Sequence, residues 1–135
     1  MSAILYQWIG HHPQTGDFRI MNIQGIRTFI YPVKDIAQAK ALYGKLLDVE
    51  PYMDEAYYVG FKIGDQDIGL DPNGHKQGMT GPVGYFHVSD IKNSLQSLLD
   101  AGAQVQQEVK DVGGGKMIAS VKDGDGNIIG LIQLP

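Results

Sequence analysis

The chain contains no cysteine among its 135 residues. Disulfides, thiolate zinc sites, iron–sulfur clusters and a cysteine nucleophile are therefore excluded by composition alone. A metal ion would have to be held by histidine, aspartate, glutamate or glutamine. No serine stands in a Gly-x-Ser-x-Gly sequence either, so the chain carries no evident nucleophile.

Long apolar runs and an excess of positive charge are also missing. No stretch approaches the ~20 apolar residues of a membrane span, and residues 1–20 lack the pattern of a signal peptide, so we expect a cytoplasmic protein. The 11 Lys+Arg are scattered and face 15 Asp+Glu, which gives a formal net charge of -4. Nucleic acid and membranes are poor partners for such a surface.

Length and composition predict one globular domain. The chain is 43% hydrophobic and 19% charged, close to the globular average. Residues 1–20 show no regular pattern and are interpreted as an N-terminal extension, with the domain at 21–135. The alternative is that residues 4–9 form an added strand or an arm at an interface, because their apolar side chains are awkward to leave in solvent.

Regular secondary structure is predicted in two series. A strand rich in β-branched and aromatic residues is expected at 25–33 and another at 83–88, each followed by a helix whose N-cap is Asp35 or Asp90. Further strands are expected at 56–63, 67–70, 104–109, 116–122 and 128–134. Each series is interpreted as strand, helix, strand, strand, strand, with two strands located after the first helix and three after the second.

The two series form repeat halves at about 22–72 and 82–135. Val33-Lys34-Asp35-Ile36 matches Val88-Ser89-Asp90-Ile91, and Ile68-Gly69-Leu70 matches Ile129-Gly130-Leu131. Paired βαβββ units imply two curved sheets that face each other across a cleft. The expected fold class is therefore α+β, with two βαβββ repeats forming curved mixed sheets around a cleft.

Three segments carry a resemblance to a known family. They are ALYGKLLDVEP at 41–51, PVGYFHVSDI at 82–91 and GGGKMIASVKDGDGNIIGLIQ at 113–133. In this order they resemble the vicinal oxygen chelate superfamily of glyoxalases, bleomycin-resistance proteins and extradiol dioxygenases, and the likeness extends over residues 22–134. Asp48 departs from the family pattern, because glycine usually stands there.

The resemblance also implies where metal ligands would lie. In metal-using members, a histidine comes from the first strand of each half and a glutamate or glutamine from the last strand. By position these sites fall on Thr28, Val83, Gly69 and Gly130. A divalent metal needs three or more nitrogen or oxygen donors, and valine and glycine side chains offer none, so we expect a member without metal or cofactor.

The candidate ligand-binding residues are His87, Tyr85, Tyr58 and Thr28. Val83, Tyr85 and His87 share one face of a period-2 strand, and the resemblance assigns this face to the cavity. An imidazole beside a phenol can hold a carbonyl, hydroxyl or phosphate, or act as acid and base. The alternative is a His87 satisfied by a neighbouring side chain or a water molecule.

Tyrosines and glycines complete the candidate cavity. Tyr57 and Tyr58 alternate along the predicted strand, so one should face the cavity and the other the core, and Tyr58 is the favoured cavity residue. Gly69 and Gly130 remove bulk at the cavity centre. An enlarged ligand pocket and close backbone packing both explain them.

Two further motifs do not indicate metal sites. Neighbouring residues on a strand point to opposite sides, which makes His11-His12 a weak metal candidate. The run Asp123-Gly124-Asp125-Gly126-Asn127 resembles the start of an EF-hand loop but lacks its later ligands, and it is typical of a hairpin turn.

Two hypotheses of function remain open, beside a purely structural or assembly role. The first is a metal-free small-molecule-binding protein that sequesters a drug or a metabolite, similar to the bleomycin-resistance members. The second is a lyase, isomerase or dioxygenase-like enzyme of the same superfamily that uses His87 as acid or base. Both need polar groups in a cavity, so residue types do not separate them. The expected partners are a small organic ligand and a second copy of the chain, because strand edges and an open cavity favour a homodimer.

Overall fold

The computed structural model describes residues 23–135, so the extension at 1–20 and the His11-His12 pair lie outside the described residues. In chain order the elements are β1 (Ile23–Pro32), α3 (Ile36–Leu47), β2 (Met53–Glu55), β3 (Tyr58–Ile63), β4 (Gln66–Asp71), the 3₁₀ helix η1 (His75–Gln77), β5 (Val83–Val88), α4 (Ile91–Asp100), β6 (Gln104–Asp111), β7 (Met117–Lys122) and β8 (Ile128–Gln133).

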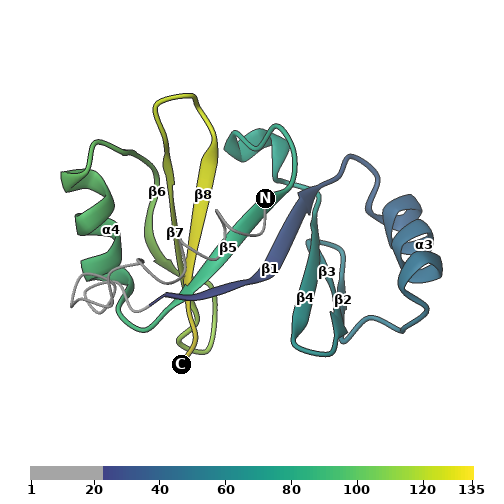
Figure 1. The fold of residues 1–135 in the computed structure, drawn as a ribbon. Helices are drawn as coiled ribbons and strands as arrows, with labels where there is room; N and C mark the ends of the chain where they lie inside the picture. Colours follow the sequence, from purple (N-terminus) through teal and green to yellow (C-terminus); the bar gives the residue numbers. More distant parts are fainter. Residues whose placement is uncertain (1–22) are drawn as a thin grey trace, which may run out of the picture.

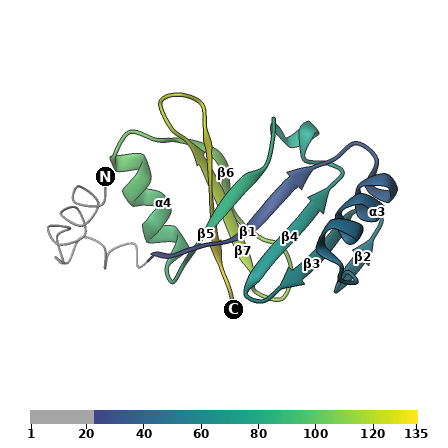
Figure 2. The same cartoon turned by 45° about the vertical axis from the view of Figure 1, so that its right-hand side comes forward.

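The strands form one mixed sheet of eight strands in the order β2-β3-β4-β1-β5-β8-β7-β6. β1 is parallel to β4 and β5 is parallel to β8, whereas the other neighbours are antiparallel. The halves meet at the β1–β5 pair, and the sheet bends there, with α3 outside one half and α4 outside the other (Figures 1 and 2). The expected α+β class with two βαβββ repeats is confirmed.

Both helices begin at the predicted caps. The Asp35 carboxylate accepts the Gln38 backbone N–H at 3.0 Å, and Asp90 accepts that of Asn93 at 3.1 Å. At the end of α3, Asp48 has a φ of 55°, in the left-handed region where glycine is the usual residue. Asp48 therefore carries a side chain at a position whose backbone conformation favours glycine.

Each half has a hydrophobic core between its helix and its strands. Under α4 the buried core residues are Val88, Ile91, Leu95, Ala119, Val121 and Leu131. Under α3 they are Val59, Phe61 and Leu70. Phe86 packs against the α4 core, as the alternation along β5 predicts. The helices thus cover one face of the sheet, and the opposite, concave face holds the candidate site.

The first half differs from its prediction at one point. The strand expected over 56–63 begins two residues later, as β3 at Tyr58, and a short strand that was not predicted, β2, precedes it at Met53–Glu55. β2 and β3 pair as a hairpin in which Met53 lies opposite Gly60, and residues 56–57 form its turn. Tyr57 therefore lies in the turn, 60% exposed, and the strand alternation does not apply to it.

Between residues 23 and 135, neither α3 nor α4 has the length and apolar character needed to cross a membrane.

Candidate functional site

Residues from both halves line a cavity of about 340 Å³ on the concave face. This volume lies in the range of small-molecule sites. Its apolar lining consists of Ile30, Met53, Met79, Val112, Ile118 and Ile132. Its polar lining consists of Thr28, Tyr57, Tyr58, Asp71, Asn73, Gln77, Tyr85, Lys110 and Lys116.

Three of the four candidate residues line this cavity, and the fourth lies beside it. Thr28, Tyr58 and Tyr85 are in the lining, whereas His87 is not. The His87 side chain is nearly buried, with 8% exposed, and its Nε2 shares a hydrogen bond of 2.9 Å with Thr28 Oγ1. The strand parity therefore places His87 on the concave face, where a neighbouring hydroxyl satisfies one of its nitrogens.

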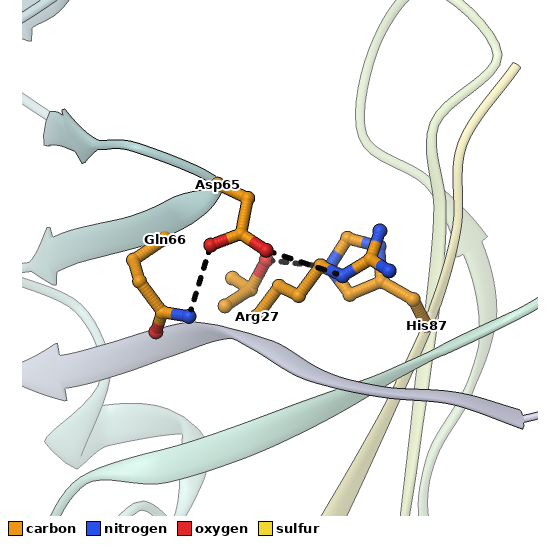
Figure 3. Close-up of polar contacts among 5 residues, drawn as sticks. Arg27, Asp65, Gln66 and His87 are labelled. Atoms are coloured by element: carbon orange, nitrogen blue, oxygen red, sulfur yellow. Dashed lines mark hydrogen bonds and ion pairs between the residues drawn. The ribbon is translucent and has the colours of Figure 1, made fainter.

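Charges around His87 come from several strands. The register of β1 against β5 shifts between Ile26 and Thr28, so Arg27 occupies an irregular position. Its guanidinium reaches toward the Asp65 carboxylate, 3.9 Å away (Figure 3). Burial lowers the pKa of His87, and the Arg27 charge lowers it further. A neutral imidazole can accept a proton, but the Thr28 bond engages its Nε2.

The Tyr58 and Tyr85 side chains lie directly over Gly69 and Gly130. A Cβ atom at Gly69 would overlap the Tyr58 hydroxyl, and one at Gly130 would lie 2.5 Å from Tyr85 Cδ2. The glycines are therefore required by close packing of tyrosine side chains. The nearest atoms belong to side chains, so close backbone packing does not explain these glycines, and the space that an enlarged ligand pocket would use beside them is filled by the two tyrosines.

A third tyrosine–glycine pair extends the same face. The Tyr52 ring lies over Gly60, where an added Cβ would be 2.7 Å from the ring. The Tyr52 hydroxyl donates to the Asp67 carboxylate at 2.9 Å. Sequence reasoning missed Tyr52, although a glycine inside a strand already indicates a close neighbour.

The phenols of Tyr58 and Tyr85 are suited to donating hydrogen bonds. Burial raises the pKa of both, and nearby aspartates raise it further, so both stay protonated. Within the described part of the chain, neither hydroxyl forms a hydrogen bond. Two neutral donors, one from each half, are thus free for a bound molecule.

A glutamine holds the loop that closes one side of the cavity. Gln106 Nε2 donates to the Gln77 carbonyl at 2.8 Å, and the Ser120 hydroxyl donates to Gln106 Oε1. Met79 of the same loop is buried. Through Gln106, β6 and β7 hold the loop that connects the two halves. Local sequence patterns do not predict this contact, because Gln106 and Gln77 lie far apart in the chain.

The residues of the cleft do not fit a metal. Thr28, Val83, Gly69 and Gly130 stand at the positions that the resemblance assigns to ligands, and tyrosine rings cover both glycines. Across residues 23–135, no three histidine, cysteine, aspartate or glutamate side chains gather as a metal site would require. The absence of a metal stays a prediction for elemental analysis.

A second hollow of about 420 Å³ lies beside α3. It is bordered mainly by Ala37, Ala41, Gly44, Pro51 and Phe61, with Lys40 and Glu50 at its rim. None of the described residues that border it is a tyrosine or a histidine, and it lies on the helix side of the sheet. The concave cavity is therefore the better candidate site.

Comparison with known proteins agrees with the fold. The sequence profile of the Glyoxalase/Bleomycin resistance protein/Dioxygenase superfamily matches residues 25–131. No curated protein matches the chain in sequence.

Several solved structures are similar in fold. An NAD-dependent benzaldehyde dehydrogenase from Legionella pneumophila superposes with a TM-score of 0.65 at 17% identity, covering 80% of this chain and 98% of that one. Methylmalonyl-CoA epimerase from Mycobacterium tuberculosis gives 0.63 at 16% identity, with 84% and 89% covered. A Mn(II)-bound glyoxalase from Novosphingobium aromaticivorans gives 0.61 at 21% identity, with 82% and 39% covered. At these identities the likeness concerns the fold alone.

Proposed function

We propose, from the premise that the chain belongs to the glyoxalase/bleomycin resistance protein/dioxygenase superfamily, that it binds a small organic molecule without a metal. One observation carries the proposal. Tyr58 and Tyr85 lie over Gly69 and Gly130, the positions where the resemblance expects carboxylate or amide ligands. Two phenol donors of the cavity lining thus lie against the positions where the resemblance expects metal ligands.

The lining favours a ligand with a flat apolar body and a hydrogen-bond acceptor. Ile30, Ile118 and Ile132 offer apolar surface, and the two phenols can donate to a carbonyl or similar acceptor. Sequestration of a drug or a metabolite is the role that this arrangement supports.

Binding is favoured over catalysis by the position of His87. Its Nε2 is engaged by Thr28, and the residue does not line the cavity. A general base must lie within hydrogen-bond reach of the proton it removes. Loss of turnover with unchanged binding in a His87→Ala variant would support the enzyme hypothesis instead.

The proposal includes a homodimer. The edge strands β2 and β6 end the sheet, and Leu42 and Leu46 on α3 are 66% and 71% exposed. Unpaired edges and exposed leucines favour a partner surface. Light scattering that gives a monomer mass at tens of micromolar would contradict it.

Native mass spectrometry of the protein purified from its own host tests the proposed function. We expect a small organic molecule to co-purify with the parent chain. The variant Ile118→Trp fills the cavity from β7 and should lose this molecule. Leu134→Trp adds the same bulk at a half-exposed position outside the cavity and should retain it. Equal occupancy in both variants would place the ligand elsewhere and contradict the proposal.

The same ligand allows a test of the phenols. Leaving a buried polar partner unpaired costs about 1–3 kcal/mol, so Tyr58→Phe and Tyr85→Phe should each weaken binding roughly 5- to 100-fold. Tyr31→Phe is the control, because Tyr31 packs against Tyr43 on the helix side of the sheet. Affinities equal to that of the parent would assign the two tyrosines to packing alone.

A further inference from the structure

The charged side chains of the cavity are distributed unevenly. Among the described residues, those that line it are Lys110, Lys116 and Asp71. The chain as a whole carries a net charge of -4, whereas the charged residues of the cavity lining sum to +1. This local excess of positive charge favours a ligand that carries a negative charge.

Both cations come from one structural unit. Lys110 lies near the end of β6, and Lys116 directly precedes β7. The turn between them is closed by the Val112 N–H donating to the Lys116 carbonyl at 2.8 Å. One hairpin therefore contributes two lysines to the lining of the same cavity.

Neither lysine is neutralised by a neighbour. Among residues 23–135, the ion pairs within 4.0 Å join Arg27 to Asp65 and Lys40 to Asp54, and Lys110 and Lys116 take part in none. An anionic group of a ligand would therefore meet two cations without first breaking an ion pair.

Asp71, the acidic residue of the lining, is engaged elsewhere. Its Oδ1 accepts the Asn73 backbone N–H at 2.8 Å, which stabilises the turn after β4. It belongs to the first half of the sheet, whereas the lysine hairpin belongs to the second. Asp71 and the two lysines thus belong to different halves of the cavity lining.

We propose that the ligand is an organic monoanion whose carboxylate lies against Lys110 and Lys116 while its flat apolar body lies over Ile118 and Ile132. The phenols of Tyr58 and Tyr85 then donate to a neutral acceptor on the same molecule. This inference rests on the proposed function and adds the charge and orientation of the ligand to it.

Three probes that share a naphthalene body and differ in charge test the proposal. Equilibrium dialysis would compare naphthalene-2-carboxylate, naphthalene-2-carboxamide and 2-naphthylmethylammonium, each up to millimolar concentration. Attraction to partly exposed lysines is modest, so we expect the carboxylate to bind about 5- to 10-fold tighter than the amide, and the ammonium probe to bind most weakly. Raising the salt concentration should reduce the preference.

Charge variants locate the effect. In Lys110→Gln/Lys116→Gln the carboxylate should bind no better than the amide. The control Lys92→Gln/Lys122→Gln changes the net charge equally at positions outside the cavity lining and should keep the preference. Retention of the preference in the cavity variant would overturn the inference.

The outcomes separate this inference from the proposed function. Equal binding of carboxylate and amide, tightest binding of the ammonium probe, or no binding of the carboxylate would each overturn the anion inference. In the first two cases the cavity still binds small molecules, provided that Ile118→Trp abolishes binding. If Ile118→Trp leaves carboxylate binding unchanged, the probe does not occupy the cavity and both proposals are contradicted.

Discussion

Gly130 is required because the Tyr85 ring occupies the space next to its Cα atom. An added Cβ would lie within 2.8 Å of three ring carbons, including Cγ, which cannot move without the whole side chain. We expect Gly130→Ala to lower the free energy of unfolding by about 1–3 kcal/mol through overpacking. Urea denaturation followed by circular dichroism measures this value.

A double-mutant cycle tests the cause. In a Tyr85→Ala background the ring is gone, so Gly130→Ala should cost much less. Gly124→Ala is the control, because open space surrounds that position. An equal cost of Gly130→Ala with and without the Tyr85 ring would show that the glycine serves another purpose.

His87 links stability to pH. Its pKa in the folded chain is lowered, chiefly by burial, so the unfolded chain takes up this proton first as the pH falls. The stabilising contribution is complete above the ordinary histidine pKa of about 6.5 and is lost as the pH falls through the folded pKa. The free energy of unfolding of the parent should therefore decrease between pH 7 and pH 5.5.

Replacing the histidine removes this dependence. His87→Gln keeps a polar partner for Thr28 but does not titrate, so its stability should change less over the same pH interval. His75→Gln is the control, because His75 is exposed in η1. If the parent and His87→Gln give parallel curves, the burial of His87 does not control the pH dependence.

The positions of single side chains could be predicted where a regular strand fixes them. The alternation of β5 correctly places Tyr85 on the concave face and Phe86 on the helix side. The same logic is wrong for Tyr57, because this residue lies in the turn before β3 and not in the strand. The Thr28–His87 hydrogen bond joins strands from different halves, so no local pattern predicts it.

At the scale of the element, α3 contains a glycine that its packing does not need. A glycine inside a helix often marks a tight packing contact, but an added Cβ at Gly44 would lie 3.7 Å from Phe61 Cε1, an ordinary contact distance. Gly44→Ala should therefore raise the free energy of unfolding by about 0.5–1 kcal/mol through helix propensity. Chemical denaturation checks the sign.

The comparison with Gly130→Ala sharpens this prediction. The two substitutions are chemically identical and should have opposite signs, since only one of the added methyl groups meets a ring at short distance. A loss of stability in Gly44→Ala would mean that α3 lies closer to Phe61 than the structure describes.

Element boundaries could be predicted where a side chain defines them. Asp35 and Asp90 are local N-caps, and both helices begin directly after them. The start of β3 could not be predicted, because it depends on the pairing of Met53 with Gly60 across the hairpin. Such pairing is decided by tertiary packing and by turn geometry together.

At the scale of the whole molecule, the sequence repeat indicated two βαβββ halves but not how they join. The join is the antiparallel β1–β5 pair, and it places Thr28 opposite Tyr85. The cavity is formed only when both halves are in place, because its lining comes from both. Its glycines were recognised in the sequence, whereas the tyrosine rings above them follow from the assembled sheet.

The cavity between the two halves is proposed to bind an organic molecule without a metal. The most direct measurement is native mass spectrometry of the complex from its own host after exhaustive dialysis against EDTA. We expect an intact complex whose mass equals the chain plus an organic ligand, with no metal. Loss of the ligand on chelation, or a complex mass that includes one metal ion per chain, would contradict it.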